Sequence, residues 1–221
     1  MKHIRKNQEP QNFTSWKQQT SENWQPHWDN FQAPEKPKTH DALLTEQGYI
    51  CCYCGRRIDR QSSHIEHFQP QKHYPELALE YTNLLASCPG YPEDKDFKLG
   101  SQPTQEHCGQ KKGDWYDRDL TVSPLLEDCA DYFRYTRDGQ ILPTQVSSMQ
   151  FAAQATITQL SLDCSSLERA RARVIEAIEP PDGLTSDEAQ KLIQAYEKLD
   201  EEGKYKRFCA TLIYRLRQSI S

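Results

Sequence analysis

Four of the eight cysteines are spaced as ligands of a single metal ion. Cys51 and Cys54 form a Cys-x-x-Cys pair, a spacing that lets two thiolates reach one tetrahedral ion from a tight turn. Gly55 follows at once and supplies the backbone freedom that such a reversal needs. Cys88 and Cys108 are the candidates for the second pair, although a polar segment separates them. We therefore expect these four thiolates to bind a structural zinc ion; the alternative is a group of buried free cysteines.

The distribution of the cysteines favours metal binding over disulfides. Five of the eight crowd into residues 51–108, and the other three sit singly. The chain of 221 residues is long enough to fold without disulfides, and no apolar export segment follows its basic start, so we expect a reducing cytoplasm. The cysteines expected to be ordinary thiols are Cys52, Cys129, Cys164 and Cys209.

A second chemically active segment, His64–His67, lies between the two expected cysteine pairs. Phosphodiester cleavage needs a base to activate water, a cation to take the developing negative charge, and groups that fix the phosphate. His67 is the candidate base, because imidazole titrates near neutral pH. Glu66 is a hard oxygen ligand of the kind that Mg²⁺ or Mn²⁺ prefers. Around the last cysteine, Lys111 and Lys112 are candidate phosphate contacts, and His107 is a candidate either for that role or for orienting a zinc thiolate.

Short strands and loops must position these residues. Tyr49-Ile50 and His64-Ile65 suggest brief strands in residues 48–120. The polar stretch Gly90–Glu106 predicts a loop between the third and fourth metal-binding cysteines. Residues 1–40 are broken by prolines, and we expect their aromatic residues to clamp onto the core rather than to form a separate binding surface. These aromatic residues are Phe13, Trp16, Trp24, Trp28 and Phe31.

The other expected elements are helices and one hairpin. A short helix is predicted from Asp41, its N-cap, to Gln47, with Gly48 ending it. The turn signal Asp138-Gly139 predicts a hairpin within residues 129–142. Four helical segments follow Ser147, and Thr185 or Ser186 caps the third, with Glu188 in its first turn. Their expected apolar faces are Phe151, Ala155, Thr158 and Leu162; Leu167, Ala170, Val174 and Ile178; Leu192, Ile193, Tyr196 and Leu199; and Tyr205, Phe208, Leu212, Ile213 and Leu216.

Charge limits the classes of partner. With 27 basic and 32 acidic residues the net charge is -5, which excludes a chain coated evenly in positive charge. Nucleic-acid binding would then depend on a metal ion or on local basic clusters. The candidate clusters are Arg56, Arg57, Arg60, Lys111 and Lys112, whereas Arg169, Arg171, Arg173, Arg215 and Arg217 are expected to be a solvated face. No apolar run approaches the ~18 residues that span a membrane, so no membrane association is expected.

The order of the motifs resembles an HNH endonuclease with a zinc-bearing ββα-metal core. The motifs that carry this resemblance are Cys51-x-x-Cys54, Glu66-His67 with Pro70, Asn83-Leu84, Cys88, and Cys108-x-x-x-Lys112-Gly113-Asp114. With further residues on both sides of this core, the whole chain resembles the PtuB-type HNH nucleases of Septu anti-phage systems, including the retron-associated versions. The residues that extend the resemblance are Met1–Lys6, Glu9, Pro10, Phe13, Trp16, Phe133, Asp138, Gly139 and Ile141.

The resemblance implies an α+β fold in three parts: an N-terminal wrapping segment (1–47), an HNH core (48–120), and a hairpin with a mainly α-helical region (121–221). We interpret the apolar stripes of that last region as core, with partner docking as the alternative. The implied function is metal-dependent hydrolysis of DNA phosphodiester bonds within a defence complex. The implied partners are a PtuA-type ATPase and, for retron-associated versions, a retron RNA–DNA complex. The alternative is a zinc-stabilised protein- or nucleic-acid-binding module without nuclease activity.

The resemblance also implies residue roles. His67 is the base, Asn83 orients it and its hairpin loop, and Glu66 stands where the family commonly has Asp. Gly109 departs from the pattern, because the family often has a metal-binding Asn or His after the last cysteine. His64 is the first choice for the missing ligand, since residues two apart on a strand share a face; His107 and Asp114 are the other candidates. The histidines expected at the surface are His3, His27, His40 and His73.

Overall fold

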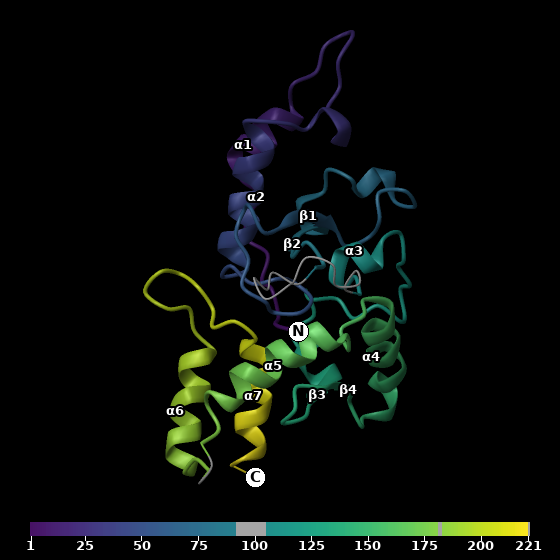
Figure 1. The fold of residues 1–221 in the computed structure, drawn as a ribbon. Helices are drawn as coiled ribbons and strands as arrows, with labels where there is room; N and C mark the ends of the chain where they lie inside the picture. Colours follow the sequence, from purple (N-terminus) through teal and green to yellow (C-terminus); the bar gives the residue numbers. More distant parts are fainter. Residues whose placement is uncertain (92–104, 181–182, 221) are drawn as a thin grey trace, which may run out of the picture.

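The computed structural model describes residues 1–91, 105–180 and 183–220. In these residues the chain forms seven α-helices and two antiparallel two-stranded sheets, which confirms the α+β class. Figure 1 shows the N-terminal helices at one end, the first sheet in the middle and the later helices at the other end. Most of the expected loop Gly90–Glu106, namely residues 92–104, lies outside the described residues, as do residues 181–182 of the expected break after the second C-terminal helical segment.

The central sheet pairs β1 (His64–His67) with β2 (Leu84–Ser87). In its register Glu66 lies opposite Leu85. All of β2 is buried, which suits its apolar sequence. The expected strand at Tyr49-Ile50 is reduced to a single bridge between Ile50 and Arg57, which closes the turn that carries the first cysteine pair. Helix α3 (Cys108–Lys112) returns beside this sheet after the undescribed segment.

The N-terminal segment forms α1 (Gln11–Lys17) and α2 (Glu35–Glu46). The prediction of Asp41 as the N-cap of α2 was wrong by seven residues, because the observed N-cap is Pro34. Pro37 lies in the first turn of the helix, where a proline is tolerated because the N–H groups of that turn have no intrahelical acceptor. The expected clamping by aromatic residues is confirmed for those that join the main core cluster, which are Phe13, Trp16 and Phe31. The boundaries 1–47, 48–120 and 121–221 stay a prediction.

The second half forms the expected hairpin and four helices. Strands β3 (Phe133–Tyr135) and β4 (Ile141–Pro143) pair antiparallel, and Gly139 in their turn has φ +87°. Thr185 caps its helix through a reciprocal pair of hydrogen bonds with Glu188, as predicted. The helices are α4 (Ser147–Gln159), α5 (Ser165–Glu176), α6 (Ser186–Tyr196) and α7 (Cys209–Gln218).

The apolar face predicted for the α4 region was right at Leu162, which is buried, and wrong at Phe151 and Thr158. Phe151 is 80% exposed, and Thr158 is exposed too. The helix is rich in Ala, Thr and Gln, so its hydrophobic periodicity is weak, and the large apolar residue Phe151 is a misleading guide to its buried face. The residues of this region that do face the core are Ala153, Thr156, Ile157 and Leu160. Leu199 and Tyr205, expected on the last two helices, lie outside them.

The prediction of a solvated arginine face fails at Arg171, whose side chain is buried. Arg171 lies four residues after Leu167 and therefore on the same helix face. Its guanidinium donates to the carbonyl oxygens of Gly139 (2.7 Å) and Leu162 (2.8 Å). Arg171 thus ties the hairpin turn to α5.

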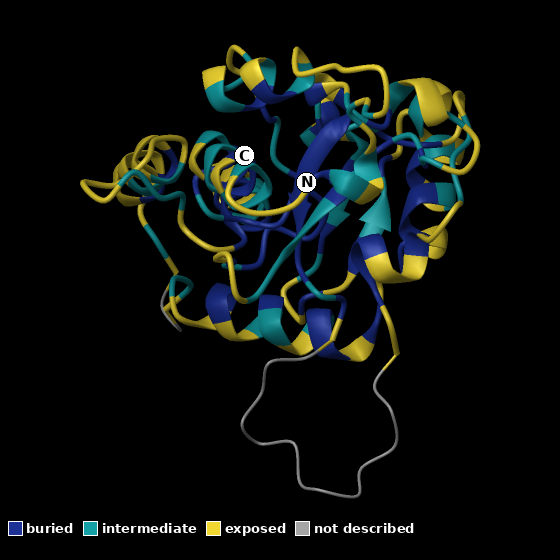
Figure 2. Ribbon diagram, turned by 90° about the horizontal axis from the view of Figure 1, so that it is seen from above, coloured by how far each residue is buried: buried dark blue, intermediate teal, exposed yellow. Residues whose placement is uncertain are grey.

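The core is continuous across the chain. One cluster of buried apolar residues includes side chains from α1, α2, β2, the hairpin and α5, while a second lies between α6 and α7. Figure 2 shows the buried residues gathered at the centre, with exposed residues along the outer sides of the helices. Among the described residues, none of the helices combines the length and apolar character that crossing a membrane requires.

Candidate active site and metal centre

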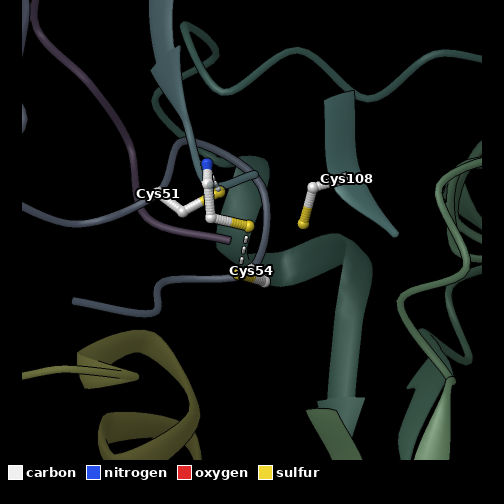
Figure 3. Close-up of side chains that lie close together, drawn as sticks. Cys51, Cys54 and Cys108 are labelled. Atoms are coloured by element: carbon white, nitrogen blue, oxygen red, sulfur yellow. Dashed lines mark hydrogen bonds between the residues drawn. The ribbon is translucent and has the colours of Figure 1, made fainter. Parts of the chain in front are cut away.

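The four predicted cysteines lie together. The Sγ atoms of Cys51, Cys54, Cys88 and Cys108 are all within 4.8 Å of one another, and all four residues are buried. Figure 3 shows three of these side chains directed toward a common space. A tetrahedral ion with Zn–S bonds of ~2.3 Å would hold its sulfur ligands about 3.8 Å apart. The Sγ atoms of Cys54 and Cys88 are 3.9 Å apart, so the cluster fits a structural metal ion such as zinc.

Three separate segments bring these thiols together. The Cys51–Cys54 turn is closed by a 3.0 Å hydrogen bond from the amide of Gly55 to the carbonyl of Cys51, and Gly55 has φ +76°. Cys88 follows β2 directly. Cys108 begins α3 with φ +57°, a conformation that is uncommon for a residue with a side chain. Its amide donates to Leu160 (2.9 Å), so the metal centre is joined to the end of α4.

The other four cysteines are buried free thiols that do not belong to this cluster, although Cys52 is adjacent to Cys51. Burial raises the pKa of Cys52 well above its usual value and also raises the pKa of Cys209. Burial raises the pKa of Cys129 to about 11. These thiols are therefore protonated near neutral pH, as expected for ordinary structural cysteines.

His107 lies at the metal centre and not at the surface. Its ring is fully buried, and Nδ1 is 3.2 Å from the Sγ of Cys108 and 3.8 Å from that of Cys88. Burial lowers its pKa to about 4, so the ring is neutral. Of the two roles considered for His107, this position suits orientation of a zinc thiolate and does not suit contact with a phosphate.

Glu66 and His64 project from the same face of β1. Glu66 is buried; its Oε2 lies 3.4 Å from the Nε2 of His64, while Oε1 accepts hydrogen bonds from Lys112 (3.0 Å) and Tyr53 (3.2 Å). Burial alone would raise the pKa of this carboxyl group, but the hydrogen bond to His64 and the positive charge of Lys112 hold it below its usual value. Glu66 is thus a charged, fixed carboxylate.

The ammonium group of Lys112 is bound inside the protein and does not face a substrate. Its side chain is 1% exposed, and Nζ donates to the carbonyl oxygen of His67 (3.0 Å) as well as to Glu66. Lys111 is exposed, as a phosphate contact requires. Sequence reasoning missed Lys72, which forms a 2.9 Å ion pair with Asp114 at the rim of the site. Only the fold reveals this pair, because 42 residues separate its members.

His67 is held by two contacts. Its Nε2 is 3.0 Å from the carbonyl oxygen of Ala78, so Nε2 carries a proton and donates it, and Nδ1 keeps its lone pair. The ring packs against Trp28, with ring centroids 4.3 Å apart and planes at 71°. Burial lowers the pKa of His67, which favours the neutral base. Trp28 was expected only as a clamping residue, and its contact with the candidate base was missed.

Asn83 closes the loop that carries the acceptor for His67. Its Oδ1 accepts from the amide of Gln69 (2.8 Å), and its Nδ2 donates to the carbonyl oxygens of Gln69 (3.0 Å) and Leu77 (3.1 Å). Leu77 directly precedes Ala78. These contacts hold the loop together; the role of Asn83 in orienting the histidine stays a prediction.

An open pocket of about 530 Å³ brings the candidate residues together. Glu66, His67 and Gly109 line its inner part, and Lys72 and Asp114 lie at its edge. One open pocket is thus lined by both the candidate base and the carboxylate.

The expected basic clusters do not form a continuous surface. Arg56 is buried and donates to the carbonyl oxygen of Tyr91 (2.9 Å). Arg57 donates to backbone carbonyls, including that of Gly48 (3.1 Å). Arg60 is exposed but forms an ion pair with Asp41.

The prediction that His40 lies at the surface was also wrong. His40 is buried on α2, and its Nε2 is 2.9 Å from the Oγ of Ser63.

Comparison with known proteins places this site in context. No family model matches the chain. It is 28% identical to the retron Vc95 putative HNH endonuclease of Vibrio cholerae over 148 residues, which cover 65% of this chain and 66% of that protein. It is 26% identical to the retron Ec83 putative HNH endonuclease of Escherichia coli over 210 residues, 79% of each protein. It is 31% identical to the Septu protein PtuB of Bacillus thuringiensis over 98 residues, 43% of this chain and 30% of that protein. These relatives confirm the resemblance to HNH endonucleases of the retron and PtuB type.

Proposed function

We propose that this chain is a metal-dependent HNH endonuclease that hydrolyses phosphodiester bonds of DNA, with β1, β2 and α3 as a ββα-metal core. The observation that carries the proposal is the pairing of Glu66 and His67 at one open pocket. The first is a fixed carboxylate, and the second is an imidazole whose Nε2 is already bound to a backbone carbonyl. The four-cysteine cluster behind them would hold a structural zinc ion.

The side chains divide the chemistry among them. His67 accepts a proton from the attacking water at Nδ1, because Nε2 is donating to Ala78. Glu66 and His64 would hold Mg²⁺ or Mn²⁺ through Oε2 and Nε2; when bound, the ion supplies positive charge against the scissile phosphate. This donor set, one carboxylate oxygen and one imidazole nitrogen on the same strand face, fits such an ion. Lys111 and Lys72 are the exposed cations that would contact the substrate backbone.

Plasmid cleavage tests this function directly. Wild-type protein is incubated with supercoiled plasmid and Mg²⁺ or Mn²⁺, alone and with the co-encoded partner. We expect nicked or linear product, loss of product with His67→Ala, and loss of product when EDTA is present. His73→Ala is the matched control, because His73 is an exposed histidine on the neighbouring loop. Equal cleavage by His67→Ala and wild type would remove His67 from the mechanism.

We further propose that this nuclease is the effector of an anti-phage defence complex in the cytoplasm, with a PtuA-type ATPase and, in the retron setting, an RNA–DNA complex. The names of the three relatives support this setting, and the eight free cysteines suit a reducing compartment. Affinity purification of the tagged chain from cells that express its neighbouring genes should recover the ATPase at a fixed ratio. Recovery of the chain alone would speak against a stable complex.

A binding module without nuclease activity is the second candidate. The ion pair of Lys112 with Glu66 favours it, because an ammonium group already neutralises the carboxylate at the expected ion site. This candidate predicts one zinc ion per chain, no second divalent ion, and no cleavage with any partner. Metal analysis by mass spectrometry combined with the plasmid assay separates the two functions.

A further inference from the structure

Gly109 lies directly against the side chains of Glu66 and His64. A Cβ atom added to Gly109 would lie 2.4 Å from the Oε2 of Glu66, 3.0 Å from its Cδ, and 2.9 Å from the Nε2 of His64. Nonbonded carbon and oxygen atoms do not approach so closely, because repulsion rises steeply below van der Waals contact. A side chain at position 109 therefore requires the Glu66 carboxylate, the His64 ring or the backbone to move.

The Glu66 carboxylate cannot move away freely. Its other oxygen, Oε1, accepts hydrogen bonds from Lys112 at 3.0 Å and from Tyr53 at 3.2 Å. Lys112 and Tyr53 are both buried, so a rotation of Glu66 removes the acceptor of the Tyr53 hydroxyl and leaves Lys112 with the carbonyl oxygen of His67 alone. The two hydrogen bonds fix the direction in which Oε2 points, toward Gly109 and His64.

The backbone at Gly109 is fixed as well. Its amide hydrogen bonds to the Oγ of Ser87 at 3.3 Å, and its neighbour Cys108 is one of the four clustered cysteines. The amide of Cys108 in turn donates to Leu160. Neither side of the contact can retreat without breaking buried interactions.

We propose that Gly109 is a positioning residue for the divalent ion: the missing side chain lets Glu66 Oε2 and His64 Nε2 converge, so that Glu66 and Gly109 form one coupled pair. What the converging atoms bind rests on the proposed function; the steric coupling does not. The longer acidic side chain at position 66 therefore requires a glycine at position 109. A substitution of either residue alone disturbs the site. When both are changed together, the shorter side chain at position 66 leaves space for a side chain at position 109.

The steric part is tested by a double-mutant cycle in urea unfolding, followed by circular dichroism. Gly109→Ala should lower the unfolding midpoint clearly in the wild-type background. In the Glu66→Asp background the same substitution should have little effect, because the shorter carboxylate no longer reaches position 109. Gln110→Ala is the control on the same short helix, since Gln110 is exposed. Zinc content of one ion per chain verifies that each variant has folded.

The ion-binding part is tested with Mn²⁺ alone, whose free concentration is measured by electron paramagnetic resonance. Gly109→Ala should weaken Mn²⁺ binding by at least about tenfold, the usual range for residues that orient metal ligands. The effect of Gly109→Asn on Mn²⁺ affinity should have opposite signs in the wild-type and Glu66→Asp backgrounds. The substitution should weaken binding beside Glu66, where it clashes, and strengthen binding relative to Glu66→Asp alone, where an amide oxygen fills the vacated space.

Two results would overturn the coupling: Gly109→Ala behaving like wild type in both assays, or the effects of Glu66→Asp and Gly109→Ala simply adding. A different result would overturn the proposed function. If wild type binds no Mn²⁺ and cleaves no plasmid, the ion-binding role of the pair fails with it, while the unfolding cycle still decides whether Glu66 and Gly109 are sterically coupled.

Discussion

Arg56, Lys112 and Arg171 are basic residues that the fold buries. Each has found acceptors inside the protein: a backbone carbonyl for Arg56, Glu66 and a carbonyl for Lys112, and two carbonyls for Arg171. Burial of such groups is tolerated only when their donors are satisfied. A count of basic residues near a sequence motif therefore overestimates the positively charged surface that is available to a substrate.

Arg171 offers a direct test of this internal use of charge. Arg171→Met keeps the length of the side chain but removes both hydrogen bonds, which leaves the carbonyls of Gly139 and Leu162 without this donor. We expect the free energy of unfolding to fall by about 3 kcal/mol, the cost of two hydrogen bonds to a charged group. Urea unfolding measures the loss. Arg169→Met, at an exposed position of the same helix, should change stability by less than about 0.5 kcal/mol. Equal stability of the two variants would contradict the anchoring role.

His40 makes stability depend on pH. Burial lowers its pKa from the ordinary 6.5, although Asp41 beside it favours the charged form and His64, Arg60 and Lys36 oppose it. Below pH 6.5 the unfolded chain therefore binds a proton at this site more readily than the folded one. Stability is present above the unfolded pKa and declines as pH falls toward the folded pKa. Between about pH 7.5 and about pH 5.5, His40→Gln should lose less stability than wild type. His73→Gln, an exposed histidine variant, should follow wild type.

At the scale of elements, local signals predicted what depends on local chemistry. The Asp138-Gly139 turn and the Thr185 cap were both predicted, because turn geometry and capping hydrogen bonds involve only a few adjacent residues. The start of α2 and the buried face of α4 were not, because tertiary packing decided them. The order of the cysteines predicted the metal cluster. The contact of Trp28 with His67 joins two distant segments, and no periodicity in the sequence predicts it.

That contact predicts that the N-terminal segment takes part in the active site. Trp28→Ala removes one of the two contacts that hold the imidazole, so the ring can turn away from the position in which the proposed mechanism needs it. We expect the turnover number for plasmid cleavage to fall roughly ten- to a hundredfold while KM changes little. Trp28→Phe should recover part of the rate, because a smaller aromatic ring still covers His67.

Trp24→Ala is the matched control for this prediction. Trp24 comes from the same segment and packs edge-on against Trp16 at 5.9 Å. A comparable loss of rate in Trp24→Ala would show that the segment matters only for stability. The ring-current shift of the His67 protons, which Trp28 should cause and Trp24 should not, gives a readout that needs no cleavage.

At the scale of the whole molecule, the metal cluster joins parts that are distant in the chain. Cys51 and Cys54 follow α2, Cys88 ends the central sheet, and Cys108 is bonded through its amide to the end of α4. A bound ion would therefore stabilise the contact between the expected nuclease core and the C-terminal helices as well as the core itself. The position of His67 and Glu66 depends on this assembly, because within the described part of the chain β1 pairs only with the strand that leads to Cys88.

The charge of the whole molecule predicts weak DNA binding by the isolated chain. The net charge is -5, and among the described residues the exposed lysines considered as substrate contacts are Lys111 and Lys72, the latter already paired with Asp114. Two phosphate contacts give a slope of about −2 in a plot of log affinity against log salt concentration. We expect fluorescence anisotropy with the His67→Ala variant to give a dissociation constant in the micromolar range or weaker at about 150 mM salt. Lys111→Ala should reduce the slope by about one.

Nanomolar binding to plain duplex DNA by the chain alone would contradict this prediction of weak binding. Tighter binding that appears only when the ATPase is added would show that the partner supplies the positive surface that the nuclease lacks.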